Sequence, residues 1–282
     1  MSKNSNPAGY IPPYNQMQRS TAKNAGYLAF NYDGAKINYR NLSRFIDLAA
    51  RAMRELHLQP GDHIAIICPS MPETCCLIYG AWQVGVMVDF YPTEYRKADY
   101  QRLISSTNPP KIIFIVETAW SKLRLLRRPK DIAIVVISPS DSKPIYKRPS
   151  ARLASRIIHP LGKPLKAERV YNFDTFTDLG RDNFEELSLS VKPETIAARF
   201  ADGSTITNQE LFNEIQRSIK DKPEIYQPQK SAFVTVPFSI RAGLVALHRN
   251  MCCGMCTILC SSSNENSIRK VTKRLHPDII IN

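Results

Sequence analysis

Glycine is scarce in this sequence of 282 residues, which has 11 glycines against 20 prolines. Average usage of about 7% would give nearly twice as many. Loops that cradle phosphate groups often depend on glycine, so this scarcity argues against a glycine-rich nucleotide loop. Hydrophobic residues at 43% and charged residues at 22% are ordinary for a globular protein, and they exclude a disordered chain.

Long hydrophobic runs are also missing. The most apolar stretch, 64–91, is interrupted by Pro69, Pro72, Glu73 and Asp89, so it falls short of the ~20 residues that a spanning helix needs. The first 16 residues are polar and lack the apolar core of a signal peptide. Seven cysteines form no regular framework, which favours reduced thiols and a cytoplasmic location.

Acidic residues are outnumbered by basic ones, which gives a net charge of +13. Residues 121–170 hold thirteen Lys/Arg and three acids, so most of the excess lies there. Within this stretch, 145–162 has the pattern of a weak basic amphipathic helix. We interpret it first as a helix whose basic face is exposed to solvent. The alternatives are that it binds an anionic membrane surface, which would make the protein peripheral at the membrane, or, less favoured, that it binds nucleic acid.

Strand and helix patterns alternate along the chain, which predicts an α/β fold of mostly parallel sheets flanked by helices. Short apolar runs typical of buried strands lie at 63–68, 86–90, 111–116 and 132–138, with helix patterns at 42–56, 72–84, 98–105 and 118–126. A second series has strands at 195–200, 232–236, 257–260 and 278–281, with helices at 207–219, 239–252 and 266–275.

These patterns suggest three segments. We expect residues 1–25 to be a mobile or loosely docked arm, 26–175 a first α/β subdomain, and 176–282 a second one. The first begins with a hairpin around Asp33-Gly34 and ends in a long connection, 139–190, that carries the basic helix. The sequence stops inside an apolar strand, so we expect the second subdomain to be incomplete at its C-terminus.

Several segments, taken in order, resemble the N-terminal portion of adenylate-forming (AMP-binding) acyl-CoA synthetases. They are a Tyr-Arg-x-Leu helix start at 39–42, PGDHIAI at 60–66, PSMPE at 69–73, GAWQVGV at 80–86 and KIIFI at 111–115. The match resumes with VTVPFSIRAG at 234–243 and SIRKVTKRL at 267–275. The phrase VVISPSDSKP, 135–144, is similar to bacterial fatty-acyl-CoA synthetases in particular.

The resemblance implies a two-step ligase reaction with ATP, Mg²⁺ and CoA. A carboxylate attacks the α-phosphate of ATP to form an acyl-adenylate, and a thiol then displaces AMP. The family's phosphate loop, rich in Gly, Ser and Thr and containing a lysine, should follow the strand at 196–200. Here the chain reads ADGSTIT from Ala201 to Thr207, which keeps Gly203, Ser204, Thr205 and Thr207 but no lysine. We interpret this segment as a degenerate phosphate loop.

The resemblance also places Phe238 and Ser239 where the family has its acyl-pocket entrance. We assign no catalytic residue and expect no cofactor for this chain alone. The four cysteines Cys252, Cys253, Cys256 and Cys260 contain a C-x-x-C spacing, but no second pair follows, so we favour small buried side chains over a metal site.

Three functional hypotheses follow, and enzymatic activity itself stays undecided at this level. The leading one is a synthetase-like protein that cannot adenylate a carboxylate by itself and has a binding or scaffolding role. The second is one piece of a split ATP-dependent ligase, completed by another chain or by a homo-oligomer. The third is a basic peripheral membrane-binding protein that reuses the fold.

Overall fold

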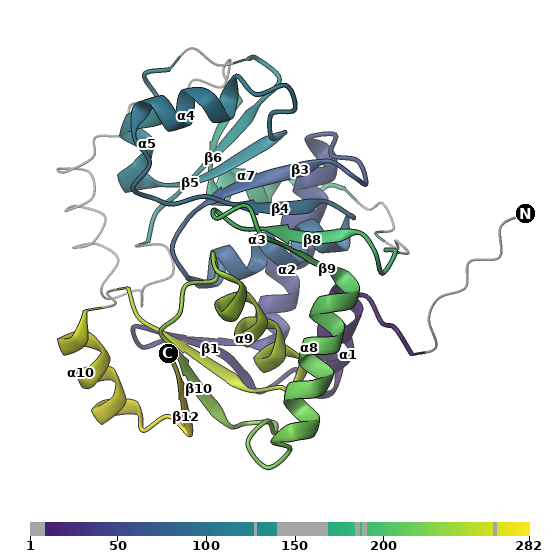
Figure 1. Ribbon diagram of the computed structural model, residues 1–282, viewed down its shortest axis with the longest axis vertical. Helices are drawn as coiled ribbons and strands as arrows, with labels where there is room; N and C mark the ends of the chain where they lie inside the picture. Colours follow the sequence, from purple (N-terminus) through teal and green to yellow (C-terminus); the bar gives the residue numbers. More distant parts are fainter. Residues whose placement is uncertain (1–8, 127–128, 140–168, 184–186, 188–190, 262–263) are drawn as a thin grey trace, which may run out of the picture.

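The computed structural model describes residues 9–126, 129–139, 169–183, 187, 191–261 and 264–282. These residues form two mostly parallel sheets with helices between and around them (Figure 1). The predicted α/β class is therefore confirmed. The basic segment 145–162, predicted as a helix, lies outside the described residues.

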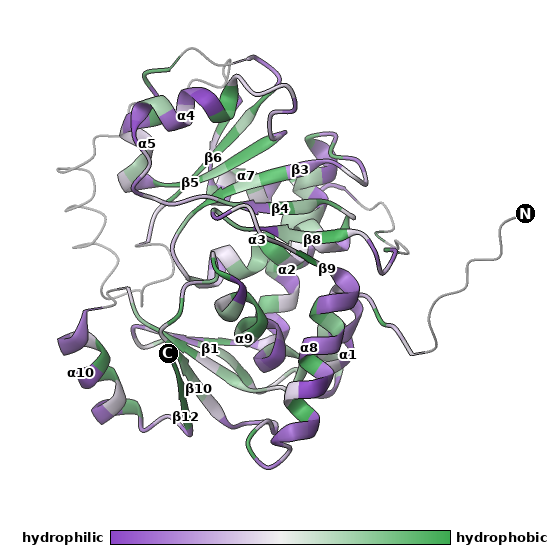
Figure 2. Ribbon diagram, viewed as in Figure 1, coloured by the Kyte–Doolittle hydropathy of each residue, from purple (hydrophilic) through white to green (hydrophobic). Residues whose placement is uncertain are grey.

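The larger sheet has seven strands in the order β7-β6-β5-β3-β4-β8-β9, and neighbouring strands are parallel except at the β8–β9 pair. Its central strands are apolar runs covered on both faces, as the sequence predicts. Figure 2 shows them as hydrophobic ribbons inside the fold. The strands are β3 (His63–Ile67), β4 (Met87–Phe90), β5 (Ile112–Val116), β6 (Ala133–Ile137), β7 (Val170–Asn172), β8 (Ile196–Arg199) and β9 (Thr205–Thr207).

The smaller sheet has five strands in the order β12-β10-β11-β1-β2. The predicted hairpin forms one edge: β1 and β2 are antiparallel, and Asp33 and Gly34 between them both have positive φ. β1 then pairs in parallel with β11, bringing Phe30 beside Thr257. The strands are β1 (Leu28–Tyr32), β2 (Ala35–Asn38), β10 (Ser231–Val234), β11 (Cys256–Leu259) and β12 (Ile279–Ile281).

The right-handed crossovers between parallel strands decide which face of the large sheet each connecting helix covers. The β3–β4 connection places α3 on one face of the large sheet, and the reversed direction of β4–β5 and β5–β6 places α4 and α5 on the other (Figure 1). The helices are α1 (Pro13–Lys23), α2 (Tyr39–Glu55), α3 (Pro72–Gln83), α4 (Lys97–Ile104), α5 (Glu117–Leu123), α7 (Phe173–Leu179), α8 (Asn208–Asp221), α9 (Arg241–Cys252) and α10 (Glu265–Leu275).

α3 and α9 join the two sheets. Every residue of α3 is buried, and its Tyr79 hydroxyl lies 2.7 Å from Nδ1 of His248 on α9. The Trp82 ring packs edge-on against the same imidazole. Because α3 packs on β4 and α9 packs on β10 and β11, one continuous apolar core runs between the two sheets.

Three local features differ from the sequence predictions. Residues 13–23 are the docked helix α1 rather than an arm: Met17 is 1% exposed, and the Tyr14 hydroxyl donates to Asp47 Oδ1 at 3.2 Å. Residues 170–179, predicted as connection, form β7 and α7. β9 was not predicted at all. These elements are short or polar, so tertiary contacts decide them rather than a local pattern.

Each sheet takes strands from both of the segments predicted as subdomains. β1 and β2, near the start of the first segment, complete the small sheet, and β8 and β9 from the second segment extend the large one. The chain therefore crosses from the small sheet to the large one after α2 and returns after α8. These crossings place the carboxyl ends of strands from both sheets around one cleft.

Candidate functional site in the cleft between the sheets

The cleft lies where strands of both sheets end. Its walls come from the residues directly after β3, β4 and β8 of the large sheet and after β1, β10 and β11 of the small one. Ligands of parallel α/β folds bind at this kind of position, outside the carboxyl ends of strands. The cavity has a volume of about 370 Å³, and its main lining residues are Tyr32, Cys68, Ser70, Tyr91, Thr93, Glu94, Ala201, Thr235, Pro237, Ser239, Leu259 and Ser261.

The lining is mostly apolar and hydroxylic. Among the described residues that line the cleft, Glu94 is the one with a charged side chain, and no lysine or arginine is present. Burial, reinforced by the charge of Asp89, raises the pKa of Tyr91 to about 12. Burial also raises the pKa of the Cys68 thiol far above its usual value. Both groups therefore stay neutral at physiological pH and add no charge to the cleft.

The turn at the position where the sequence resemblance predicts a phosphate loop connects β8 to β9 at the edge of the cleft. Its backbone closes on itself: Phe200 N donates to Ser204 O at 2.8 Å, and Gly203 N donates to Phe200 O at 2.9 Å. Gly203 has a φ of +84°, which glycine adopts without strain. Of the turn, Ala201 lines the cavity. Gly203 and Ser204 lie outside the lining.

Asp202 takes the donors that an anion would need. Both the backbone N and the Oγ of Ser204 donate to Asp202 Oδ1, at 2.9 Å and 2.6 Å. These hydrogen bonds lower the pKa of the exposed Asp202 carboxyl, with the Ser204 hydroxyl as the largest cause. The turn thus presents a negative charge where a phosphate-binding loop presents free N–H groups.

The remaining loop residues have structural contacts. Thr207 is the N-cap of α8: its Oγ1 accepts from Glu210 N at 3.2 Å, and its own N donates to Glu210 Oε2 at 2.8 Å. Thr205 begins β9, and its carbonyl accepts from Arg241 at 3.2 Å. Arg241, a cation beside this turn, forms an ion pair with Glu214. Thr205 and Thr207 therefore lie outside the cleft.

The two residues predicted at the acyl-pocket entrance separate. Ser239 lines the cleft, whereas the Phe238 ring is 1% exposed and packs in the core. The Phe238 N–H donates to Ser70 Oγ at 2.8 Å, which ties this segment to the residues after β3. Gly243 allows the close approach of the segment to α9, because a Cβ there would lie 1.9 Å from the Pro237 carbonyl oxygen.

The residues present do not fit a Mg-triphosphate. The N–H groups of Phe200, Gly203 and Ser204 are bonded within the turn. Asp202 and Glu94 are acidic, and Arg241 is neutralised by Glu214. Within the described part of the chain, no three His, Cys, Asp or Glu side chains come close enough together to hold a metal ion. This includes the four cysteines near α9 and β11, where burial raises the pKa of Cys253 and Cys256 to about 11 and so disfavours the thiolate.

A comparison with protein-family models places more than half of this chain in one family. The profile of the family described as "AMP-binding enzyme" matches residues 17–173, which is more than half of the chain. The chain belongs to this family. No curated protein sequence matches it.

Solved structures of several ligases and a synthetase share the fold of this chain at low sequence identity. A benzoate CoA ligase from Burkholderia xenovorans is 16% identical with a TM-score of 0.73, and the match covers 96% of this chain and 50% of that one. A coronafacic acid ligase from Pectobacterium brasiliense is 12% identical with a TM-score of 0.71, over 96% and 49%. A fatty acyl CoA synthetase from Mycobacterium tuberculosis is 12% identical with a TM-score of 0.65, over 93% and 47%.

The chain therefore spans about half the length of these solved structures, and its fold corresponds to the N-terminal portion of adenylate-forming enzymes. In the described ranges, none of the helices has the length and apolar character to cross a membrane.

Sequence reasoning missed most of the cleft lining. Tyr32, Tyr91 and Ser261 were not singled out, because they come from separate segments with no shared motif. The available signal was positional: each of these residues lies at the end of a strand of a mostly parallel sheet or within two residues after it.

Proposed function

We propose that this AMP-binding family member does not form acyl-adenylates by itself and instead binds an apolar, uncharged ligand in the cleft between the sheets. The observation that carries the proposal is the turn between β8 and β9. At the position where the family resemblance predicts the phosphate loop, the N–H groups of Phe200, Gly203 and Ser204 donate hydrogen bonds within the turn itself.

The charge of the cleft supports the same conclusion. A triphosphate carries several negative charges, and their removal from water needs opposing charges or aligned donors. Glu94 and Asp202 would instead repel it, while the Tyr32 and Tyr91 rings and the apolar lining favour a hydrocarbon body. The Ser70 hydroxyl accepts from Phe238 N and can still donate its own proton to an uncharged polar group. The Thr93 and Thr235 hydroxyls donate to Glu94 and to the Ile281 carbonyl oxygen, so they can only accept from a ligand.

The nucleotide part of the proposal is tested by calorimetric titration of the purified chain with Mg-ATP, AMP and a non-hydrolysable acyl-adenylate analogue. We expect no saturable binding up to millimolar concentration. A dissociation constant in the micromolar range, near −8 kcal/mol, would refute the proposal and make the split-ligase hypothesis the leading one. A parallel assay for pyrophosphate release with benzoate and dodecanoate should show no turnover.

The cleft itself is tested with dodecanol and with dodecanoate as its charged counterpart. We expect dodecanol to bind more tightly, because the cleft lining described here offers a carboxylate no positive partner. Ser239→Trp should fill the cleft and abolish this binding. Ser105→Trp, at the exposed end of α4, is the matched control and should leave it unchanged. Equal binding to the two Trp variants would place the ligand elsewhere.

A further inference from the structure

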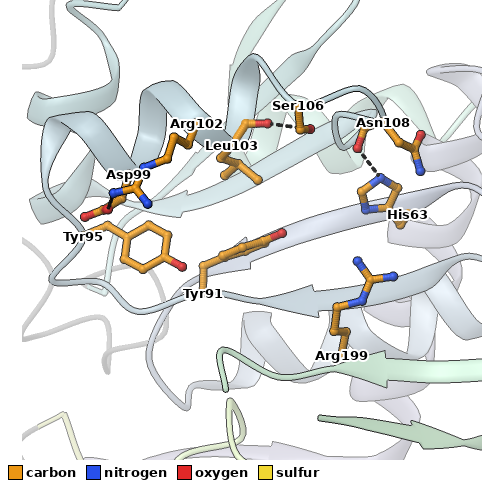
Figure 3. Close-up of a pocket in the computed structure, with 9 residues that line it drawn as sticks. All are labelled: His63, Tyr91, Tyr95, Asp99, Arg102, Leu103, Ser106, Asn108 and Arg199. Carbon is orange, nitrogen blue, oxygen red and sulfur yellow. Dashed lines mark hydrogen bonds and ion pairs between the residues drawn. The ribbon is translucent and has the colours of Figure 1, made fainter. Parts of the chain in front are cut away.

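A second cavity also borders Tyr91 (Figure 3). It lies beside α4, and its lining includes residues of α4 and of the large sheet. Its volume is about 260 Å³. This is below the usual range for drug-sized ligands, so the cavity suits a compact molecule. Unlike the cleft between the sheets, it has basic side chains in its lining: Arg199 from β8, Arg102 from α4 and His63 from β3. The one carboxylate in the lining, Asp99, is paired with Arg102.

Arg199 is held by a long ion pair with the buried carboxylate of Asp89 rather than by a hydrogen bond. Its nearest carboxylate contact is Asp89 Oδ2 at 3.6 Å, which is beyond hydrogen-bond distance. Among the described residues, no hydrogen bond to its guanidinium is formed, and the side chain is 43% exposed. Arg102 differs, because Asp99 Oδ1 accepts from it at 2.8 Å. Arg199 therefore keeps a full set of planar donors facing the cavity.

Asp89 explains why Arg199 stays extended toward the cavity without a direct bond. The Asp89 side chain is 1% exposed, and its Oδ2 lies 2.7 Å from His63 Nδ1. The other nitrogen of His63, Nε2, lies 3.2 Å from the Asn108 carbonyl oxygen. Asp89 and Arg199 are paired in register on adjacent strands, so the buried carboxylate attracts the guanidinium while His63 takes its hydrogen bond.

The wall opposite these polar groups is aromatic. The Tyr91 and Tyr95 rings meet edge to face with centroids 5.8 Å apart. Figure 3 shows the Tyr91 hydroxyl and the Arg199 guanidinium on the side of the cavity where His63 lies. A planar guanidinium beside a tyrosine hydroxyl and an aromatic wall matches an oxyanion attached to a small flat or compact body.

We propose that this cavity is a binding site for a small oxyanion, a carboxylate or a phosphate, held by the Arg199 guanidinium and flanked by Tyr91 and Tyr95. The site is separate from the cleft between the sheets, and it does not depend on the ligand proposed there. Tyr91 borders both cavities, so the two sites share one wall.

The test uses the whole chain with benzoate and inorganic phosphate as separate probes and benzamide as the uncharged counterpart of benzoate, all at constant ionic strength. Binding is followed by NMR of the arginine Nε–H resonances, in which Arg199 is assigned by its loss in Arg199→Gln. We expect saturable binding of at least one anion in the millimolar range. Benzamide should bind at least tenfold more weakly than benzoate if benzoate is the anion that binds.

Variants separate charge from geometry. Arg199→Gln should weaken anion binding at least tenfold, and Arg199→Lys should give an intermediate loss because it keeps the charge but not the fork. The matched control is Arg181→Gln, whose arginine is 63% exposed and paired with Asp178 on α7. It should bind like the unmodified chain, and thermal melting should confirm that each variant is folded.

Tyr91→Phe gives a second variant that leaves all charges in place, and it should weaken binding less than Arg199→Gln does. The proposal is overturned if neither anion saturates by about 20 mM, if benzamide binds as well as benzoate, or if Arg199→Gln and Arg181→Gln behave alike. Binding of phosphate alone or benzoate alone supports the site and identifies which oxyanion it prefers.

Discussion

Replacing His248 by asparagine should flatten the acid side of the stability profile of this protein. The imidazole is fully buried on α9, and its neighbours are the Tyr79 hydroxyl at 2.7 Å, the Cys252 thiol at 3.7 Å and the Trp82 ring. Burial lowers the pKa of His248 to about 3. Burial also raises the pKa values of Tyr79 and Cys252, so both neighbours stay uncharged below neutral pH.

The sign and size follow from linkage. In the unfolded chain a histidine has a pKa of about 6.5, so between about pH 6.5 and pH 3 the unfolded state binds a proton that folded His248 refuses. The stability contributed by neutral His248 is thus intact above pH 6.5 and is lost as pH falls. With 1.36 kcal/mol per pKa unit, the loss from this one residue is about 2 kcal/mol at pH 5.

The assay is urea unfolding at pH 7 and at pH 5 for the unmodified chain, His248→Asn and His57→Asn. His57 is exposed with a positive φ, which asparagine tolerates, so it is the matched control. We expect His248→Asn to be less stable at pH 7 but to lose about 2 kcal/mol less than the other two proteins on going to pH 5. The same pH-dependent loss in all three would refute the burial argument.

Two further substitutions test the packing around the cleft and the assignment of the loop residues. Gly243→Ala should cost stability at the upper end of the roughly 1–3 kcal/mol seen for overpacking, because its Cβ would meet the Pro237 carbonyl oxygen, whereas Gly26→Ala, with open space around it, should be nearly neutral in thermal unfolding. Thr207→Ala should lower stability by about 1 kcal/mol through loss of the α8 cap and should leave dodecanol binding unchanged, with Thr205→Ala as the control. A loss of dodecanol binding without a loss of stability would show that Thr207 contacts the ligand.

The sequence predicted the central strands well because their signal is local. β3, β5 and β6 are continuous runs of branched apolar residues, and burial on both faces demands such runs. The strand order, the docking of α1 and the transfer of β8 and β9 to the large sheet depend on contacts between distant segments. No local pattern in a polar stretch such as 13–23 carries that information.

The candidate site was predictable in part. The segment after β8 is visibly short in the sequence, but its internal bonding through Asp202 depends on side-chain geometry. The assignment of Phe238 and Ser239 to an acyl-pocket entrance stays a prediction; Ser239 lines the cleft, whereas Phe238 is buried in the core. Arg199 shares one sheet face with His63 and Asp89 only because β8, which is far away in sequence, pairs with β4.

The pairing of β1 with β11 also sets an order of events during synthesis. Phe30 leaves the ribosome more than two hundred residues before its neighbour Thr257. At about 5–20 residues per second, this interval lasts roughly 10 to 45 seconds. During that time Ala29 and Phe30, which end fully buried, have no strand on one side of them. The five-stranded sheet therefore closes late, after the strands at the centre of the seven-stranded sheet have been synthesised.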